Sequence, residues 1–288
     1  MYYAELLLVG LVWGCTYALM ALGLTLVYGL LRILHVAQAS VFTLGAYIGV
    51  VTAAQTGSLA MASIAAAVTA GLVGPLIYRL VYQPVLDQPP FVPLVASIGI
   101  VIAMEDGFRL IFGPYGKPFD HGPALAATYG LGDISISAVQ AAIVVTALAL
   151  VVVLNVLAMR TRVGVAWRAT VSDPAMAESF GIRVQNVRYL CFFIASVLAG
   201  FAGVLIGLLN GLVEPGMGGV VSYKGLAIIV LGGLGNVQGT LIASVLLGIV
   251  ESVGGVFLGN VLDRDAIAFL FVIVVLLLRP QGLFGQAR

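Results

Sequence analysis

The chain has 288 residues, of which 61% are hydrophobic and only 9% carry a charge, against roughly 25% charged residues in soluble domains. This composition excludes a soluble globular core, and a formal net charge of +1 with scattered basic residues excludes nucleic acid or another polyanion as a partner. The composition predicts an all-α polytopic membrane protein with one transmembrane domain over residues 1–288.

Nine apolar segments are candidates for membrane spans, because a helix of about 20 apolar residues crosses the hydrocarbon core. The segments are 5–30, 36–56, 59–82, 91–113, 137–159, 187–212, 223–236, 239–258 and 262–279. About nine transmembrane helices, with a range of eight to ten, are therefore expected. The seventh segment is short, which favours a half-helix or a re-entrant segment beside a cavity. No Lys or Arg precedes Arg32, so the first segment is expected to remain as a span rather than be cleaved as a signal.

Two polar interruptions of the apolar pattern, one in each half of the chain, indicate where a transport path lies. His35, Gln38 and Ser40 place hydrogen-bonding side chains at the start of the second segment. Asn210 and Glu214 belong to a Gly- and Pro-containing break between the sixth and seventh segments. These five residues are the predicted translocation path. A purely structural role is the alternative for His35, and with two distant histidines no metal site is predicted.

Charged residues within or beside the apolar segments are expected to be paired. Glu105 and Arg109 stand four positions apart near the outer end of the fourth segment, a spacing that favours a structural ion pair. Glu251 lies in the middle of the eighth segment and needs a partner or a proton there. The loop at 113–137, with Lys117, Asp120 and His121, is expected to be solvated and to lie where an external substrate-delivery protein would land.

Small residues recur every four positions in two segments, which predicts close helix packing there. They are Ala62, Ala66, Ala70 and Gly74 in the third segment, and Ala195, Ala199, Gly203, Gly207 and Gly211 in the sixth. The pattern leaves open whether these faces meet helices of the same chain or a second subunit.

The longest polar passage, residues 160–188, is predicted to be a loop with one helix inside it. Asp173 suits an N-cap, Pro174 the first helical position and Gly181 the left-handed residue after the helix, which predicts a helix from Pro174 to Phe180. Met176 and Phe180 lie on one face of it. So short a helix is marginal alone, which favours docking into a partner's groove; an ordered connector is the alternative.

The charge distribution orients the chain if residues 160–188 are cytoplasmic, with the N-terminus outside and the C-terminus inside. Cations then concentrate on the cytoplasmic side, as the positive-inside rule requires. The nine inner cations are Arg32, Arg79, Arg160, Arg162, Arg168, Arg183, Arg188, Arg279 and Arg288, and the four outer ones are Arg109, Lys117, Lys224 and Arg264. Arg160, Arg162 and Arg168 are expected to anchor the loop at the lipid or at a partner's surface.

Five motifs resemble those of LivH-like permeases, the membrane subunits of bacterial ABC importers of the branched-chain amino-acid type. The first is the spacing of Arg168-Ala169, Asp173, Ala177 and Gly181-Ile182 in the loop. The others are HVAQAS, YQPV with VPLVASIGI and FGP, LGGLGNVQGTLIASVLLGIVES, and LLLRPQGLFG. Ala39 and Ser40 depart from the Gly-Glu pair that is usual in the family.

The resemblance implies a permease subunit of the bacterial inner membrane, surrounded by lipid, that is not itself an enzyme. It implies a second homologous permease, identical or different, two ABC ATPase subunits and a periplasmic substrate-binding protein as partners. ATP and Mg²⁺ are expected on the ATPases and no cofactor on this chain, which has no Walker A motif. The residues expected to couple to the ATPase are Arg168, Asp173, Pro174, Met176, Ala177, Phe180 and Gly181.

The resemblance points to branched-chain or other amino acids as substrates, with urea, short amides or aromatic acids as alternatives within the family. Two other functions are also open to a chain of this kind. One is an ion-coupled secondary transporter that uses Glu251 as a proton carrier, and the other is a passive channel for small neutral solutes.

Overall fold

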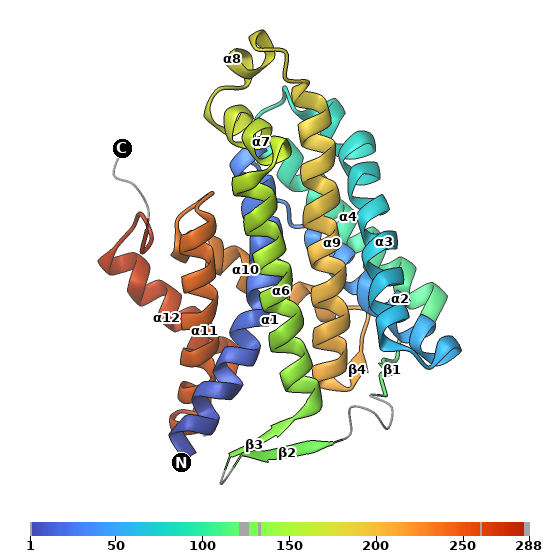
Figure 1. Cartoon of the computed structure of the whole chain (residues 1–288), viewed down its shortest axis with the longest axis vertical. Helices are drawn as coiled ribbons and strands as arrows, with labels where there is room; N and C mark the ends of the chain where they lie inside the picture. Colours follow the sequence, from blue (N-terminus) through green and yellow to red (C-terminus); the bar gives the residue numbers. More distant parts are fainter. Residues whose placement is uncertain (1, 121–126, 132–133, 260, 285–288) are drawn as a thin grey trace.

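The computed structural model describes residues 2–120, 127–131, 134–259 and 261–284, and helices make up most of them (Figure 1). The elements are α1 (Tyr2–Leu31), α2 (Gln38–Thr56), α3 (Leu59–Ile77), η1 (Tyr78–Tyr82), η2 (Gln83–Val85), α4 (Phe91–Phe112), β1 (Lys117–Pro118), β2 (Thr128–Leu131), β3 (Ile134–Ser137), α6 (Ala138–Arg160), α7 (Arg162–Ser172), α8 (Pro174–Ser179), α9 (Val184–Asn210), β4 (Leu212–Val213), α10 (Met217–Gly232), α11 (Val237–Phe257) and α12 (Arg264–Leu278). Antiparallel pairs form between β1 and β4, with Lys117 opposite Val213, and between β2 and β3. The predicted all-α polytopic class is confirmed.

All nine predicted apolar segments are helical, but they are not equally long. In the described part of the chain, seven helices are long and apolar enough to cross a membrane. The other two are α10, with 16 residues, and α12, with 15; at 1.5 Å per residue each is shorter than the roughly 30 Å hydrocarbon core. The seventh segment is thus a short helix, as predicted, although it begins six residues earlier, at Met217 rather than 223.

Helix α9 lies at the centre of the bundle and packs against α1, α2 and α3. The small-residue face of α3 meets it directly, because Ala62, Ala66 and Ala70 are fully buried and a Cβ added at Gly200 would lie 2.7 Å from the Ala70 Cβ. The face of the sixth segment also packs within this chain, because a Cβ added at Gly203 would clash with the Phe42 carbonyl oxygen of α2. Both small-residue faces therefore allow helix backbones to approach closely. In contrast, α4 and α6 are the least buried of the long helices, which is the arrangement expected of surfaces that face lipid.

The chain turns back into the bundle between α1 and α2. Helix α1 ends at Leu31, and Arg32 takes a left-handed conformation with φ 54°. Helix α2 then begins at Gln38, whose Nε2 donates to the carbonyl oxygen of Ala195 in the middle of α9 at 2.9 Å. The Ala37 N–H meets the Ser97 hydroxyl at 2.8 Å. Non-helical backbone at this depth is tolerated because protein surrounds it and supplies such partners.

The two ends of the molecule differ in character (Figure 1). Helices α7 and α8 project at one end, which we call the α8 end, and the four short strands lie at the other, the strand end. At the outer part of α4, Arg109 pairs with Glu105 at 2.5 Å and with Asp106 at 3.0 Å, so the predicted Glu105–Arg109 pair is confirmed. His121 and Arg288 lie outside the described residues.

Opposite sidedness of the two ends is testable by labelling. We expect a membrane-impermeant maleimide to label Tyr115→Cys, at the strand end, in intact spheroplasts, and to label Glu178→Cys, on α8, only after the membrane is opened. Both native side chains are exposed, and the background carries Cys15→Ala and Cys191→Ala because those buried thiols are the chain's two cysteines. Labelling of both positions from the same side would contradict the assigned orientation.

Candidate functional site

Helix α8 is built by local capping, as the sequence predicts. The Asp173 carboxylate accepts a hydrogen bond from the Met176 N–H at 3.0 Å, and Pro174 occupies the first turn. At the other end Gly181 has φ 84°, and the Ile182 N–H donates to the Ala177 carbonyl at 3.0 Å. The helix is one residue shorter than predicted, since it ends at Ser179 with Phe180 as its cap.

The side chains of α8 divide into an inner and an outer set. Ala177 is buried against the rest of the chain, whereas Met176 is 55% exposed and Phe180 is 80% exposed. Large apolar side chains at the tip of a projecting helix gain nothing from the fold itself, because they remain in contact with water. The predicted i, i+4 apolar pair is therefore accessible at the α8 end.

The prediction of a loop with a single helix is wrong for residues 162–172, which form a second helix, α7. Thr161 caps it, because its hydroxyl accepts from the Gly164 N–H at 3.2 Å. Arg168 Nη1 donates to the Ala158 carbonyl near the end of α6, where a cation meets the unpaired carbonyls and the negative end of the helix dipole. Arg168 thus links α7 to α6 and is half-buried, and its contact with a partner stays a prediction.

The three path residues predicted in the first half lie inside the bundle. His35 is buried, with Nδ1 at 2.7 Å from the Tyr82 hydroxyl and its ring edge-on to Tyr82 and Phe192. Gln38 is fully buried at the α2–α9 contact. Ser40 is also buried and borders a space of only about 10 Å³. In this conformation the protein encloses all three side chains, and their role in a path stays a prediction.

Asn210 and Glu214, the path residues of the second half, line a much larger space. This space, which we call the α10 cavity, has a volume of about 410 Å³ and is bounded by α1, α9, α10, α11 and α12. Asn210 ends α9 and Glu214 follows β4, so the cavity lies toward the strand end. The structure therefore brings these two predicted residues together at one cavity, while Ser40 borders a different, small space that Pro215 and Gly218 also line.

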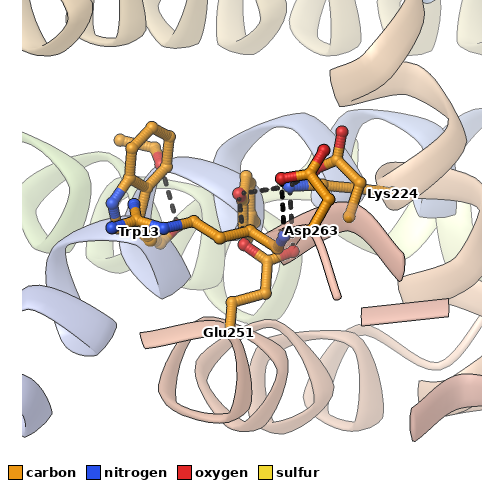
Figure 2. A network of polar contacts seen from close by, with 8 residues as sticks. Trp13, Lys224, Glu251 and Asp263 are labelled. Carbon is orange, nitrogen blue, oxygen red and sulfur yellow. Dashed lines mark hydrogen bonds and ion pairs between the residues drawn. The ribbon is translucent and has the colours of Figure 1, made fainter. Parts of the chain in front are cut away.

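A buried ionic cluster forms one wall of the α10 cavity (Figure 2). Lys224 Nζ lies 2.9 Å from Glu251 Oε1 and 2.8 Å from Asp265 Oδ1. The Tyr17 hydroxyl donates to Glu251 Oε2 at 2.8 Å and accepts from Lys224 at 3.0 Å, while the Lys224 ammonium sits 5.1 Å from the centre of the Tyr17 ring. The side chains of Lys224 and Glu251 are only 7% and 5% exposed, against 41% for Asp265.

The prediction that Glu251 has a partner is thus confirmed. The partner is Lys224, and the predicted place of Lys224 was wrong. Lys224 is predicted to lie on the outer side, at the start of the segment 223–236, whereas it lies within α10 and is buried. The sequence holds a signal for this position, because it is apolar on both sides of Lys224, from Met217 to Gly232. That pattern is compatible with a helix that begins before residue 223. Within the described residues, no group of three His, Cys, Asp or Glu side chains is placed to hold a metal ion.

Comparison with known proteins places these features in one family. The family model described as branched-chain amino acid transport system / permease component matches residues 6–278. The chain is 30% identical over 297 residues to the high-affinity branched-chain amino acid transport system permease protein BraD of Pseudomonas aeruginosa, which covers 99% of this chain and 96% of BraD. It is 30% identical over 298 residues to LivH, the permease protein of the same kind of system in Escherichia coli K12, with the same coverage.

The fold also resembles a solved structure, PsaBC from Streptococcus pneumoniae in complex with Fab. The TM-score is 0.54 at 11% sequence identity, over 99% of this chain and 94% of the other, so the likeness concerns the fold alone. The match of the family model over nearly the whole length and the two full-length relatives agree with the helical bundle described above. The chain belongs to the permease component family of branched-chain amino acid transport systems.

Proposed function

We propose that the chain is an inner-membrane permease subunit of a bacterial ATP-driven ABC importer, and that the importer's substrates are branched-chain amino acids. The observation that carries the proposal is the family match over residues 6–278, in a chain whose α8 presents Met176 and Phe180 to solvent. The family description and the names of both relatives specify branched-chain amino acids. Urea, short amides and aromatic acids remain the alternative substrates.

In the proposed assembly, α8 docks in a groove of an ABC ATPase subunit, and two such ATPases hold ATP and Mg²⁺. Two observations support this role: the accessible apolar pair on α8 and the way α8 is joined to the membrane helices. Helix α8 contacts α7 and α9, and α7 in turn contacts α1, α6 and α9. Closure of the ATPases on ATP would therefore move α7 and α8 together and tilt the spans to which they are attached.

The other partners follow from the two remaining surfaces. A periplasmic substrate-binding protein would deliver its solute at the strand end, where the α10 cavity lies. A second homologous permease would complete the path, and lipid would cover exposed apolar side chains of α4 and α6 such as Ile102 and Val152. The binding protein would thus cover the strand end, and lipid would cover the exposed faces of α4 and α6.

Uptake by the reconstituted importer tests the proposal. The chain is placed in vesicles with a homologous permease, ABC ATPases and a periplasmic binding protein from the same organism, and is supplied with ATP and no proton gradient. We expect accumulation of labelled leucine, isoleucine and valine in preference to urea, acetamide and benzoate. Accumulation of urea or amides but of no amino acid would overturn the substrate assignment, and uptake that needs a proton gradient and no ATP would overturn the importer.

A further inference from the structure

We propose that the α10 cavity binds the amino acid as a zwitterion on its way through the membrane. Lys224 receives the carboxylate and Asp265 receives the α-ammonium group. The inference rests on the proposed function for the class of substrate, and it goes beyond it by assigning the groups of this chain that hold the two charges.

The cluster has one cation between two carboxylates, and the two carboxylates differ in their surroundings. Glu251 is buried and also accepts the Tyr17 hydroxyl, so it fixes the position of the Lys224 ammonium from the protein side. Asp265 lies on α12 and is 41% exposed, so it is the accessible partner. The contact between Lys224 and Asp265 is therefore the one that a solute in the cavity can reach and replace.

Insertion of a zwitterion at this contact leaves neither Lys224 nor Asp265 without a partner of opposite charge. The ligand carboxylate takes the place of Asp265 beside Lys224, and the ligand ammonium pairs with the Asp265 carboxylate that has been released. An anion without the ammonium would leave Asp265 without its cation, and a cation without the carboxylate would have to compete with Lys224 for Asp265. Because unpaired charges in a poorly solvated site are costly, the arrangement selects for a ligand with both charges.

Asn210, Glu214 and Arg264 also line the cavity, and another part of its wall suits an aliphatic side chain. Its volume of about 410 Å³ falls in the range of about 300–1,000 Å³ that small-molecule sites occupy. Ile206, Val220, Val221 and Trp13 form apolar wall beside the charged cluster, and burial of a branched aliphatic group against them is favourable. Figure 2 shows Trp13 on the opposite side of the view from Lys224, with Glu251 below the two. A charged wall and an apolar wall thus share one cavity.

Direct binding of leucine to the assembled transporter, without the binding protein and without ATP, tests the inference. Asp265→Asn removes the ammonium partner but leaves Lys224 its contacts with Glu251 and Tyr17. Asp263→Asn is the matched control, because it removes one carboxylate two positions away and an asparagine still caps α12 at the Arg264 N–H, which Asp263 binds at 2.8 Å. We expect Asp265→Asn to weaken leucine binding about tenfold or more, as for loss of a charged hydrogen bond, and Asp263→Asn to leave it unchanged.

Competition on the unmutated transporter gives a test that needs no variant. Leucinamide lacks the carboxylate and 4-methylpentanoate lacks the ammonium, so each is expected to compete about tenfold or more less well than leucine. Equal competition by either analogue, equal leucine binding by Asp265→Asn, or equal losses in both variants would overturn the inference. If leucine is taken up by the complete importer but shows no saturable binding here, the zwitterion site is wrong and the proposed function stands. If no amino acid is taken up, both fail.

Discussion

Phe180→Asp is expected to abolish ATP-driven uptake while the chain remains inserted and folded. The Phe180 side chain is 80% exposed, so the change costs the isolated chain little, within about 0.5 kcal/mol for a surface substitution. In a docked complex, however, the carboxylate would lose its water inside an apolar groove. Loss of an aromatic hot spot costs about 2 kcal/mol or more, which is roughly a thirtyfold loss of affinity. Pull-down of the ATPase and vesicle uptake measure the two effects.

Two controls separate the docking face from a general effect of charge on α8. Phe180→Leu keeps an apolar group at the tip and is expected to retain most of the uptake. Ala175→Asp adds the same charge to the exposed first turn of the helix, where the helix dipole favours it, and is expected to retain ATPase binding. Normal pull-down and full uptake by Phe180→Asp would remove the basis for assigning α8 to the ATPase contact.

Glu251→Leu is expected to reduce the yield of folded protein severely. Leucine leaves the Lys224 ammonium buried without its most buried carboxylate partner, and breaking a buried ion pair from one side costs roughly 3–5 kcal/mol. The Tyr17 hydroxyl loses its acceptor as well, which adds about 1–3 kcal/mol. The double variant Lys224→Met with Glu251→Leu removes both charges and is expected to recover much of the yield. Size-exclusion profiles and thermal unfolding of the unmutated protein, Glu251→Leu and the double variant measure these differences.

Glu251→Gln distinguishes this structural role from proton transport. Glutamine keeps the shape of the side chain and can still accept from Tyr17, so we expect near-normal yield and uptake with ATP in the absence of a proton gradient. A proton carrier cannot function with glutamine, because an amide does not titrate in the physiological range. Loss of transport by Glu251→Gln at normal yield, together with gradient-dependent uptake by the unmutated protein, would favour a secondary transporter.

Local features of the sequence were sufficient to predict most of the helices and all of the α8 boundaries to within one residue. Apolar segments of span length become helices because the bilayer leaves backbone groups no other partner. Asp173, Pro174 and Gly181 act on groups within four residues of themselves, so their effect can be inferred without the fold. Helix α7 was missed although Thr161 caps its start, because its stability depends on packing against α6 and α9, which the local sequence does not show.

The arrangement of the charged and polar side chains was decided only by the tertiary structure. Tyr17 and Glu251 are 234 positions apart in sequence, and Lys224 joins them only because α1, α10 and α11 pack together. His35 and Gln38 were grouped with Asn210 and Glu214 by their polarity, but packing buries the first pair beside α9 and sets the second at the α10 cavity. The apolar sequence around Glu251 indicates that this charge needs a partner. The choice of partner depends on which helices meet and on the depth of each residue along them.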